Sequence, residues 1–200
     1  EAESTGLADH MLQSGAAEGY ALWLGAKNES LVTALAARSP FVELIIVDED
    51  DERVSRLQRQ FDAADLSGRV TAQQTSLAEL SLPPYLANML FVGQELTPML
   101  LADGAPIRRI YESVRPYGGV MCLLAESKDI PRVQEQVVAL QLEQAEVEAT
   151  DFGVVVRRVG SLPGAGVWNH QHGNVANTIN SSDQRVKLPL GVLWFGGSSH

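Results

Sequence analysis

Short apolar or β-branched runs alternate with helical patterns along most of this chain, and that alternation constrains the fold more than any other feature. The runs occupy residues 20–24, 41–47, 69–73, 87–92 and 120–124. Several are followed by apolar residues at spacings of three and four, such as Val54, Leu57 and Phe61, which indicate helices. Alternating strands and helices predict a parallel sheet with right-handed crossovers and helices on both faces.

The end of this pattern differs from its beginning. Residues 147–150 and 152–157 form two short strand-like runs around a tight turn at Asp151, which favours an antiparallel hairpin. The predicted fold class is therefore α/β, with a Rossmann-like, doubly wound, mostly parallel seven-stranded sheet. The sheet ends in a C-terminal antiparallel hairpin, and an irregular or β tail follows it. Helices are expected near residues 6–17, 107–114 and 131–143, among others.

Composition excludes some classes of partner. The chain has 200 residues and a formal net charge of -10, which repels nucleic acid phosphates and anionic lipids. The basic pairs Arg108-Arg109 and Arg157-Arg158 are too sparse to form a basic groove. No apolar run approaches the roughly 20 residues of a membrane span. We expect a soluble protein with no nucleic acid or membrane partner, and a buried thiol at its one cysteine, Cys122.

Two residues at predicted strand ends suggest a ligand site. Gly25 follows the first strand and Asp48 follows the second, 23 positions later. This spacing lets a carboxylate hydrogen-bond a ribose whose neighbouring groups rest against the first turn. Asp48 could equally be the N-cap of the helix that follows it. Both interpretations remain open on the sequence alone.

With a further landmark at residues 115–119, Arg-Pro-Tyr-Gly-Gly, residues 6–158 resemble the class I S-adenosylmethionine (SAM)-dependent methyltransferases, the terminal hairpin included. The resemblance implies SAM or S-adenosylhomocysteine as cofactor. It assigns the methionine part to the turn at Gly25 and Ala26, and the ribose to Asp48 with help from Glu49. It places the adenine near Ser76 and Leu77, where Ser76 stands in place of the usual aspartate.

The cofactor motifs match this family unevenly. The turn keeps Gly25 alone, because residues 26–29, Ala-Lys-Asn-Glu, replace the further glycines and add Cβ atoms where backbone would approach a ligand. After the fourth strand, Gln94 and Glu95 are the only polar candidates for catalysis. A lone carboxylate in a solvated loop shows no convergence of catalytic groups, so no catalytic residue is assigned. The leading hypothesis is a non-catalytic or weakly ligand-binding methyltransferase-fold module, and the alternative is an active SAM-dependent methyltransferase of unknown acceptor.

The composition changes near residue 160, which predicts a domain of residues 1–159 followed by a linker and β segment of residues 160–200. Residues 168–178 and 189–195 resemble the opening of a quinoprotein (PQQ)-type β-propeller, with two tryptophan strands around a polar turn. The chain is thus expected to be part of a larger propeller protein. Use of SAM would imply the cytoplasm, and a quinoprotein parent would instead allow an extracytoplasmic location.

Two further expectations concern the tail. His170 and His172 would lie on one side of an extended strand, but two ligands without a third make a surface strand the preferred interpretation, and no metal is assigned. Trp168 and the apolar run at residues 192–195 need burial. They are expected to pack on the domain or on a second copy, which would give a homo-oligomer through the tail.

Overall fold

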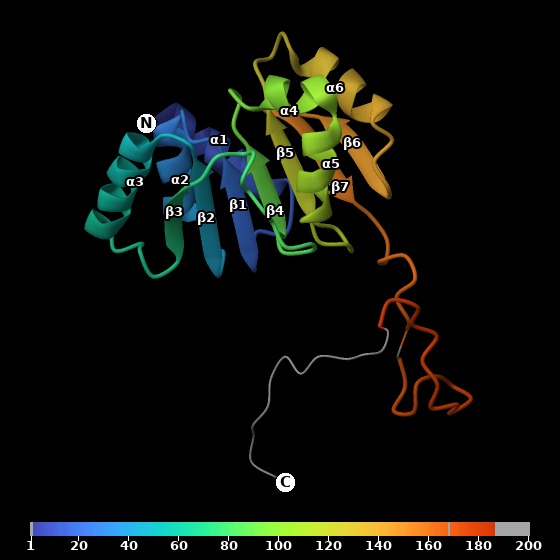
Figure 1. Cartoon of the computed structure of the whole chain (residues 1–200). Coiled ribbons are helices and arrows are strands. Elements are labelled where there is room, and N and C mark those ends of the chain that lie inside the picture. The colour runs from blue at the N-terminus through green and yellow to red at the C-terminus, as the bar shows by residue number, and fades with distance from the viewer. Residues whose placement is uncertain (1, 168, 187–200) are drawn as a thin grey trace. The chain divides into compact units, whose positions relative to one another are not determined.

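The computed structural model describes residues 2–167 and 169–186. Helices and strands alternate through the first part of these residues, as Figure 1 shows. In chain order they are α1 (Ala2–Gln13), β1 (Tyr20–Leu24), α2 (Glu29–Arg38), β2 (Glu43–Asp48), α3 (Asp51–Ala63), β3 (Val70–Gln74), β4 (Met89–Val92), α4 (Thr97–Asp103), α5 (Ala105–Glu112), β5 (Val120–Leu124), α6 (Ile130–Ala139), β6 (Ala145–Ala149) and β7 (Gly153–Arg158).

The strands form one seven-stranded sheet in the order β3-β2-β1-β4-β5-β7-β6. Strands β1 to β5 run parallel, whereas β7 pairs antiparallel with both β5 and β6. The predicted fold class is confirmed, including the hairpin at the end of the sheet. The strand order reverses between β1 and β4, which in open α/β sheets opens a crevice beyond the carboxyl ends of the strands.

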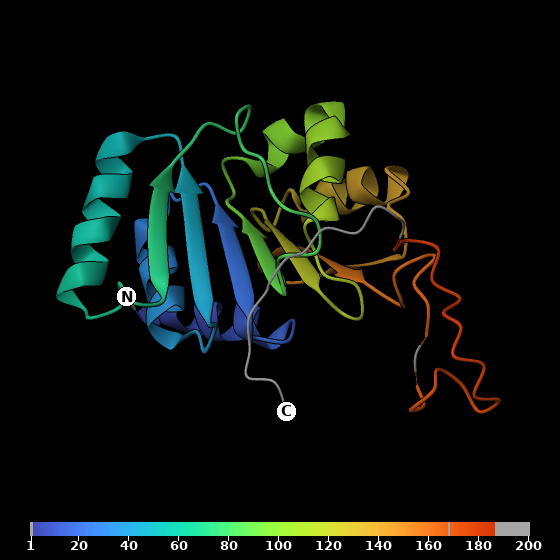
Figure 2. The ribbon, with the colours of Figure 1, turned by 60° about the horizontal axis from the view of Figure 1, so that its bottom comes forward.

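Each face of the sheet has its own apolar core. One core joins the sheet to α1, α2 and α3 through residues such as Met11, Leu35 and Phe61. The other joins it to α4, α5 and α6 through residues such as Ile107 and Val133. Figure 2 lets the two groups of helices be followed on either side of the strands. Burial of both faces explains the nearly continuous apolar sequences of the central strands β1, β4 and β5, whereas the edge strand β6 is part-exposed.

The helical region after β4 differs from the prediction. A single helix near residues 107–114 was expected, but the structure has both α4 and α5, separated by Gly104 with φ of +71°. A left-handed residue at this point ends one helix and turns the chain into the next, which glycine does without strain. The sequence of α4, TPMLLAD, is too short to show helical periodicity, so this helix was missed.

Two buried acidic groups predict a stability that falls at high pH. Burial raises the pKa of the Cys122 thiol to about 12, and desolvation raises the pKa of Tyr111 to about 12. In the unfolded chain these groups lose their protons near their ordinary values of 9.0 and 10.0, so the unfolded state binds fewer protons between these values and pH 12. Stability is therefore full below pH 9 and lost as the pH rises through this window.

We expect thermal unfolding at pH 10.5 to show a loss of about 2 kcal/mol from Cys122 alone, relative to pH 7.5. The Cys122→Ala variant should show a correspondingly smaller difference between the two pH values. An equal difference in both proteins would contradict the assignment to this thiol.

The chain divides into two compact units, of which the second begins at Ser161. In its described part the backbone is irregular apart from an isolated bridge between His170 and Gly173. The carboxylate of Asp183 accepts hydrogen bonds from the amides of Gly166, Val186 and Arg185, and the Gly166 amide is the main cause that holds its pKa below the usual value. The expected second tryptophan strand at residues 189–195 and Trp168 lie outside the described residues.

Among the described residues, no helix is long and apolar enough to cross a membrane. The same residues contain no group of three or more histidine, cysteine, aspartate or glutamate side chains that could hold a metal ion.

Candidate functional site

The turn after β1 is held by hydrogen bonds on both sides. The Gly25 amide donates to the Val47 carbonyl, 2.8 Å away, and the Trp23 indole Nε1 donates to the Gly25 carbonyl at 2.6 Å. Gly25 has φ of +78°, and a Cβ atom there would lie 2.6 Å from the side chain of Leu96. Glycine is therefore required at this position by the fold itself, whether or not a ligand approaches it.

Asp48, at the end of β2, is almost fully engaged by the protein. Its side chain is 5% exposed. One carboxylate oxygen accepts from the Ala26 amide at 2.6 Å, and the other accepts from the Asp50 amide at 2.9 Å and from the Arg53 guanidinium at 2.6 Å. Arg53 thus covers the carboxylate that the resemblance assigns to a ribose.

The N-cap interpretation of Asp48 is wrong. The N-cap of α3 is Asp50, whose carboxylate accepts from the Arg53 amide at 3.0 Å. This hydrogen bond is the main cause that lowers the pKa of Asp50 below its ordinary value. Asp48 instead ties the end of β2 to the turn after β1, through the Ala26 amide.

Glu95, which follows β4, turns back over the turn after β1. Its Oε1 accepts from the Lys27 amide at 2.9 Å, and its carboxylate lies 2.8 Å from where Cβ atoms on Gly25 and Gly93 would stand. Glu95 lies in the part-exposed loop after β4, and its carboxylate is held against the turn after β1. Gln94 points elsewhere, since its Nε2 donates to Glu126 at 3.2 Å. Both residues line a cavity beside Gly25, but their side chains bind different partners.

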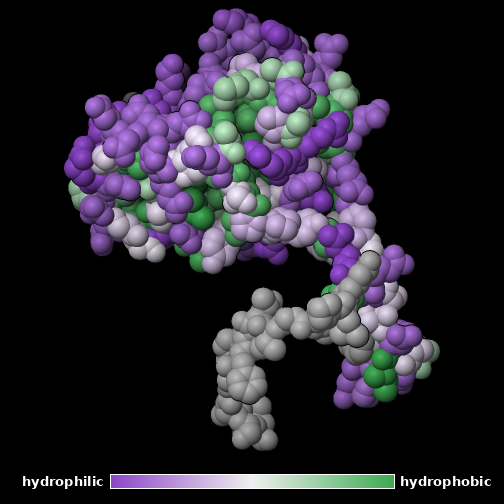
Figure 3. All heavy atoms as spheres, viewed as in Figure 1, coloured by the Kyte–Doolittle hydropathy of each residue, from purple (hydrophilic) through white to green (hydrophobic). Residues whose placement is uncertain are grey.

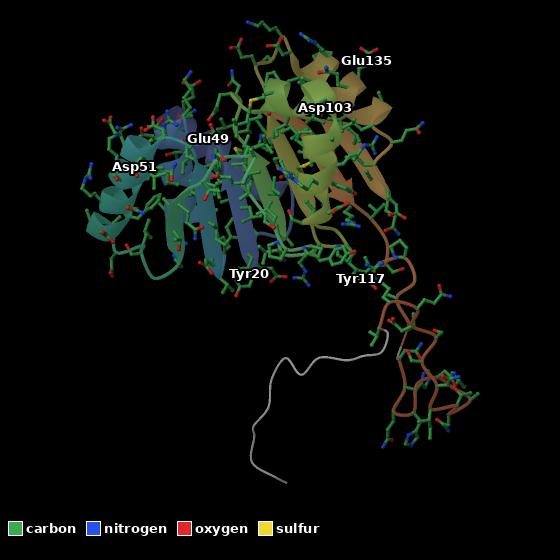
Figure 4. The ribbon with its side chains drawn as sticks, in the orientation of Figure 1. Tyr20, Glu49, Asp51, Asp103, Tyr117 and Glu135 are labelled. Atoms are coloured by element: carbon green, nitrogen blue, oxygen red, sulfur yellow. The ribbon has the colours of Figure 1, made fainter. Side chains whose placement is uncertain are left out.

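The residues assigned to adenine are brought together only in part. Glu49 Oε1 accepts from the Leu77 amide at 3.0 Å, which joins the ends of β2 and β3. Ser76 is engaged in its own turn, because its hydroxyl donates to the Glu79 carboxylate at 3.1 Å. Figure 4 shows Glu49 at the carboxyl ends of the parallel strands, just after β2, and Tyr20 at their amino ends, where β1 begins.

Two cavities adjoin the carboxyl ends of these strands. The smaller one, about 350 Å³, lies between the ends of β1, β2 and β3 and is lined by Asp48, Glu49, Arg53 and Leu77, among others. The larger one, about 770 Å³, lies between α1, the turn after β1 and the segments after β4 and β5. Both cavities are lined by Gly25 and Glu95. Ala26 and Ser76 line neither of them.

The charged groups of the larger cavity are mostly paired with one another. Lys128 lies 2.6 Å from Glu126, and the Glu126 pKa is lowered chiefly by this hydrogen bond. His10 lies 3.1 Å from Asp151. The Glu95 carboxylate is likewise bound, to the Lys27 amide. The cavity can hold a small polar molecule, but its paired groups do not provide a nucleophile hydrogen-bonded to a base that a third residue orients.

Sequence reasoning missed the role of Arg53 and gave none to Trp23. Arg53 lies five residues after Asp48 and three after the N-cap, so the first turn of α3 folds its side chain back onto both carboxylates. That local spacing was a usable signal. No local signal could have placed Glu95 on Lys27, because 68 residues separate them.

No protein-family model matches this chain, and no curated protein matches it. Solved structures do resemble it. A putative SAM-dependent methyltransferase from Methanococcus maripaludis is 13% identical, with a TM-score of 0.66 over 80% of this chain and 87% of that one. A geranyl diphosphate methyltransferase in complex with SAM is 8% identical, with a TM-score of 0.57 over 72% of this chain and 66% of that one. The [4+2]-cyclase SpnF is 16% identical, with a TM-score of 0.59 over 72% and 57%.

Identities this low establish the fold alone. The chain has the class I methyltransferase-like fold, an α/β Rossmann-like sheet of seven mostly parallel strands with a C-terminal hairpin. It spans less than two thirds of the length of the cyclase and just under two thirds of the geranyl diphosphate enzyme. Fold does not determine function, so the activity depends on the residues that line the cleft.

Proposed function

We propose that residues 1–159 form a methyltransferase-fold module that transfers no methyl group and binds ligands in its cleft weakly or not at all. One observation carries this proposal, namely the pairing of Asp48 with Arg53 and two backbone amides. A carboxylate that is already satisfied and nearly buried gains little from ribose hydroxyls, because each new hydrogen bond must replace an existing one.

The turn after β1 supports the same proposal. In this fold, backbone amides at the start of the first crossover helix would be available to an anionic ligand group. Here the Glu95 carboxylate accepts from the Lys27 amide and lies against Gly25. The hydrogen-bonding groups that SAM would need at Asp48 and Lys27 are engaged within the chain, so the residues present do not fit the cofactor in this arrangement.

The alternative, an active SAM-dependent methyltransferase of unknown acceptor, is favoured by the two cavities beside Gly25. They lie at the reversal of strand order, where ligands bind in such sheets. Binding would require Arg53 and Glu95 to swing away. The fold also occurs in a protein named as a [4+2]-cyclase, so by analogy alone the fold does not limit such a cleft to methyl transfer.

Thermal unfolding with added SAM or S-adenosylhomocysteine separates these proposals. We expect a change below about 1 °C at millimolar ligand. A ligand at 100 times its dissociation constant would add about 2.7 kcal/mol of stability, which corresponds to about 5–10 °C in a chain of this size.

The Asp48→Asn variant serves as the control, because it keeps the shape of the side chain and removes its charge. A saturable rise of the unfolding temperature in the wild type that this variant loses would overturn the proposal of weak or absent binding and assign the ribose to Asp48.

We also propose that this module belongs to a larger protein that contains a β-propeller. The assignment of residues 160–200 to the start of a quinoprotein-type propeller rests on the sequence resemblance alone. The described part of this tail has an isolated bridge and no strand that would support it.

A further inference from the structure

A third cavity lies on the α4–α5 side of the domain, apart from the two in the cleft. It measures about 210 Å³ and is lined by Leu77, Leu80 and Leu82 of the loop after β3, by Met99 and Leu100 of α4, and by Arg109 of α5. Figure 3 shows apolar residues gathered over α4 and the adjoining loop, with hydrophilic residues around them. Met99, at 54% exposure, is one of the large apolar side chains that remain open to solvent.

The lining of this cavity favours an apolar ligand. Water inside it would find few hydrogen-bond partners, because Arg109 is the only side chain with a polar group among the lining residues. An apolar ligand would release that water and bury the exposed carbon surface. At about 30 Å³ for each water-sized unit, the cavity has room for about seven units, which matches a medium-length aliphatic chain rather than a drug-sized molecule.

Arg109 defines the polar end of such a ligand. Its Nη2 donates to the Leu77 carbonyl at 3.0 Å. Among the described residues, no carboxylate lies within ion-pair distance of this guanidinium, in contrast to Arg38, Arg53 and Arg56. A guanidinium offers five N–H donors in a fixed plane that matches a carboxylate. What sets Arg109 apart from the other arginines outside ion pairs, such as Arg108, is that it lines an apolar cavity, where its positive charge can hold an anion.

We propose that this cavity binds a small aliphatic carboxylate, with the chain among the leucines and the carboxylate on Arg109. This cavity is separate from the two cavities of the cleft, although Leu77 lines both it and the smaller of those two. Leu77 nevertheless contacts both regions, since its amide donates to Glu49 in the cleft and its carbonyl accepts from Arg109.

Calorimetric titration of the full chain with octanoate tests the proposal, and 1-octanol is the neutral probe of the same chain length. We expect saturable binding of octanoate and at least tenfold weaker binding of octanol, because a hydrogen bond to a charged group contributes about 1.5–3 kcal/mol. The Arg109→Gln variant should bind octanoate about tenfold more weakly than the wild type.

The Arg108→Gln variant is a matched control. Arg108 stands next to Arg109 on α5, but its guanidinium donates to the Leu140 carbonyl and does not line the cavity. This variant should bind octanoate like the wild type. The Met99→Trp variant, with a larger side chain at an exposed position, should fold normally and lose binding because the indole fills the mouth of the cavity.

Four results would overturn the proposal, and the first three concern the carboxylate and Arg109. These are the absence of saturable octanoate binding to the folded wild type, equal affinities for octanoate and octanol, and equal losses in Arg109→Gln and Arg108→Gln. Uptake that Met99→Trp leaves unchanged would show general adsorption on the surface, and would overturn it as well.

Discussion

Replacing Trp23 with alanine is expected to lower the free energy of unfolding by about 3–5 kcal/mol, the usual range for a large buried aromatic side chain. Trp23 is 1% exposed and stacks on Phe91 with ring centroids 5.3 Å apart. Its indole also donates to the Gly25 carbonyl, so the substitution removes core contacts and releases the turn after β1. Urea denaturation followed by circular dichroism measures the loss.

The Trp23→Phe variant separates packing from hydrogen bonding. It keeps an aromatic ring against Phe91 and removes the indole N–H, so it should cost about 1–2 kcal/mol. If both variants lose the same amount, the hydrogen bond to Gly25 dominates and the packing argument fails.

Replacing Asp48 with alanine is expected to lower the free energy of unfolding by about 3 kcal/mol. Removal of one partner of a buried ion pair typically costs about 3–5 kcal/mol, and the 20% exposure of Arg53 places this pair at the lower end. The substitution also leaves the Ala26 amide without its acceptor at the junction of β1 and α2. Differential scanning calorimetry at neutral pH gives the value.

Asp50→Ala is the comparison for this prediction. Asp50 caps α3 and pairs with Arg53 from an exposed position, so its loss should cost clearly less than the loss of Asp48. A smaller effect of Asp48→Ala than of Asp50→Ala would show that Asp48 does not hold the turns together. It would also restore interest in Asp48 as a residue kept for a ligand.

The order of elements could be predicted because strand and helix periods differ and because both faces of this sheet are buried. The apolar run at residues 120–124 and the amphipathic pattern of Val54, Leu57 and Phe61 each permit one interpretation. Helix α4 could not be predicted. Its seven residues are shorter than two turns, and its burial depends on α5 and α6 rather than on its own pattern.

The candidate site could be located but not characterised from the sequence. Spacing from Gly25 brought Asp48 into consideration, and the turn chemistry of residues 26–29 indicated a loop without the glycines of the family. The sequence did not reveal that Arg53 pairs with Asp48 or that Glu95 accepts a hydrogen bond from the Lys27 amide of that loop. Glu95 reaches Lys27 through pairing of β1 with β4, a contact that exists only once the sheet has formed.

The place of β7 in the sheet has a consequence for how the chain is made. The strand between β5 and β6 is the last of the seven in sequence, so a ribosome must reach Arg158 before β5 gains its second neighbour and β6 gains its only one. Until then β5 can pair with β4 alone, and the other side of its five buried residues, VMCLL, is an open edge that can template aggregation. Translation of the six residues Gly153–Arg158 thus completes the sheet and covers that edge.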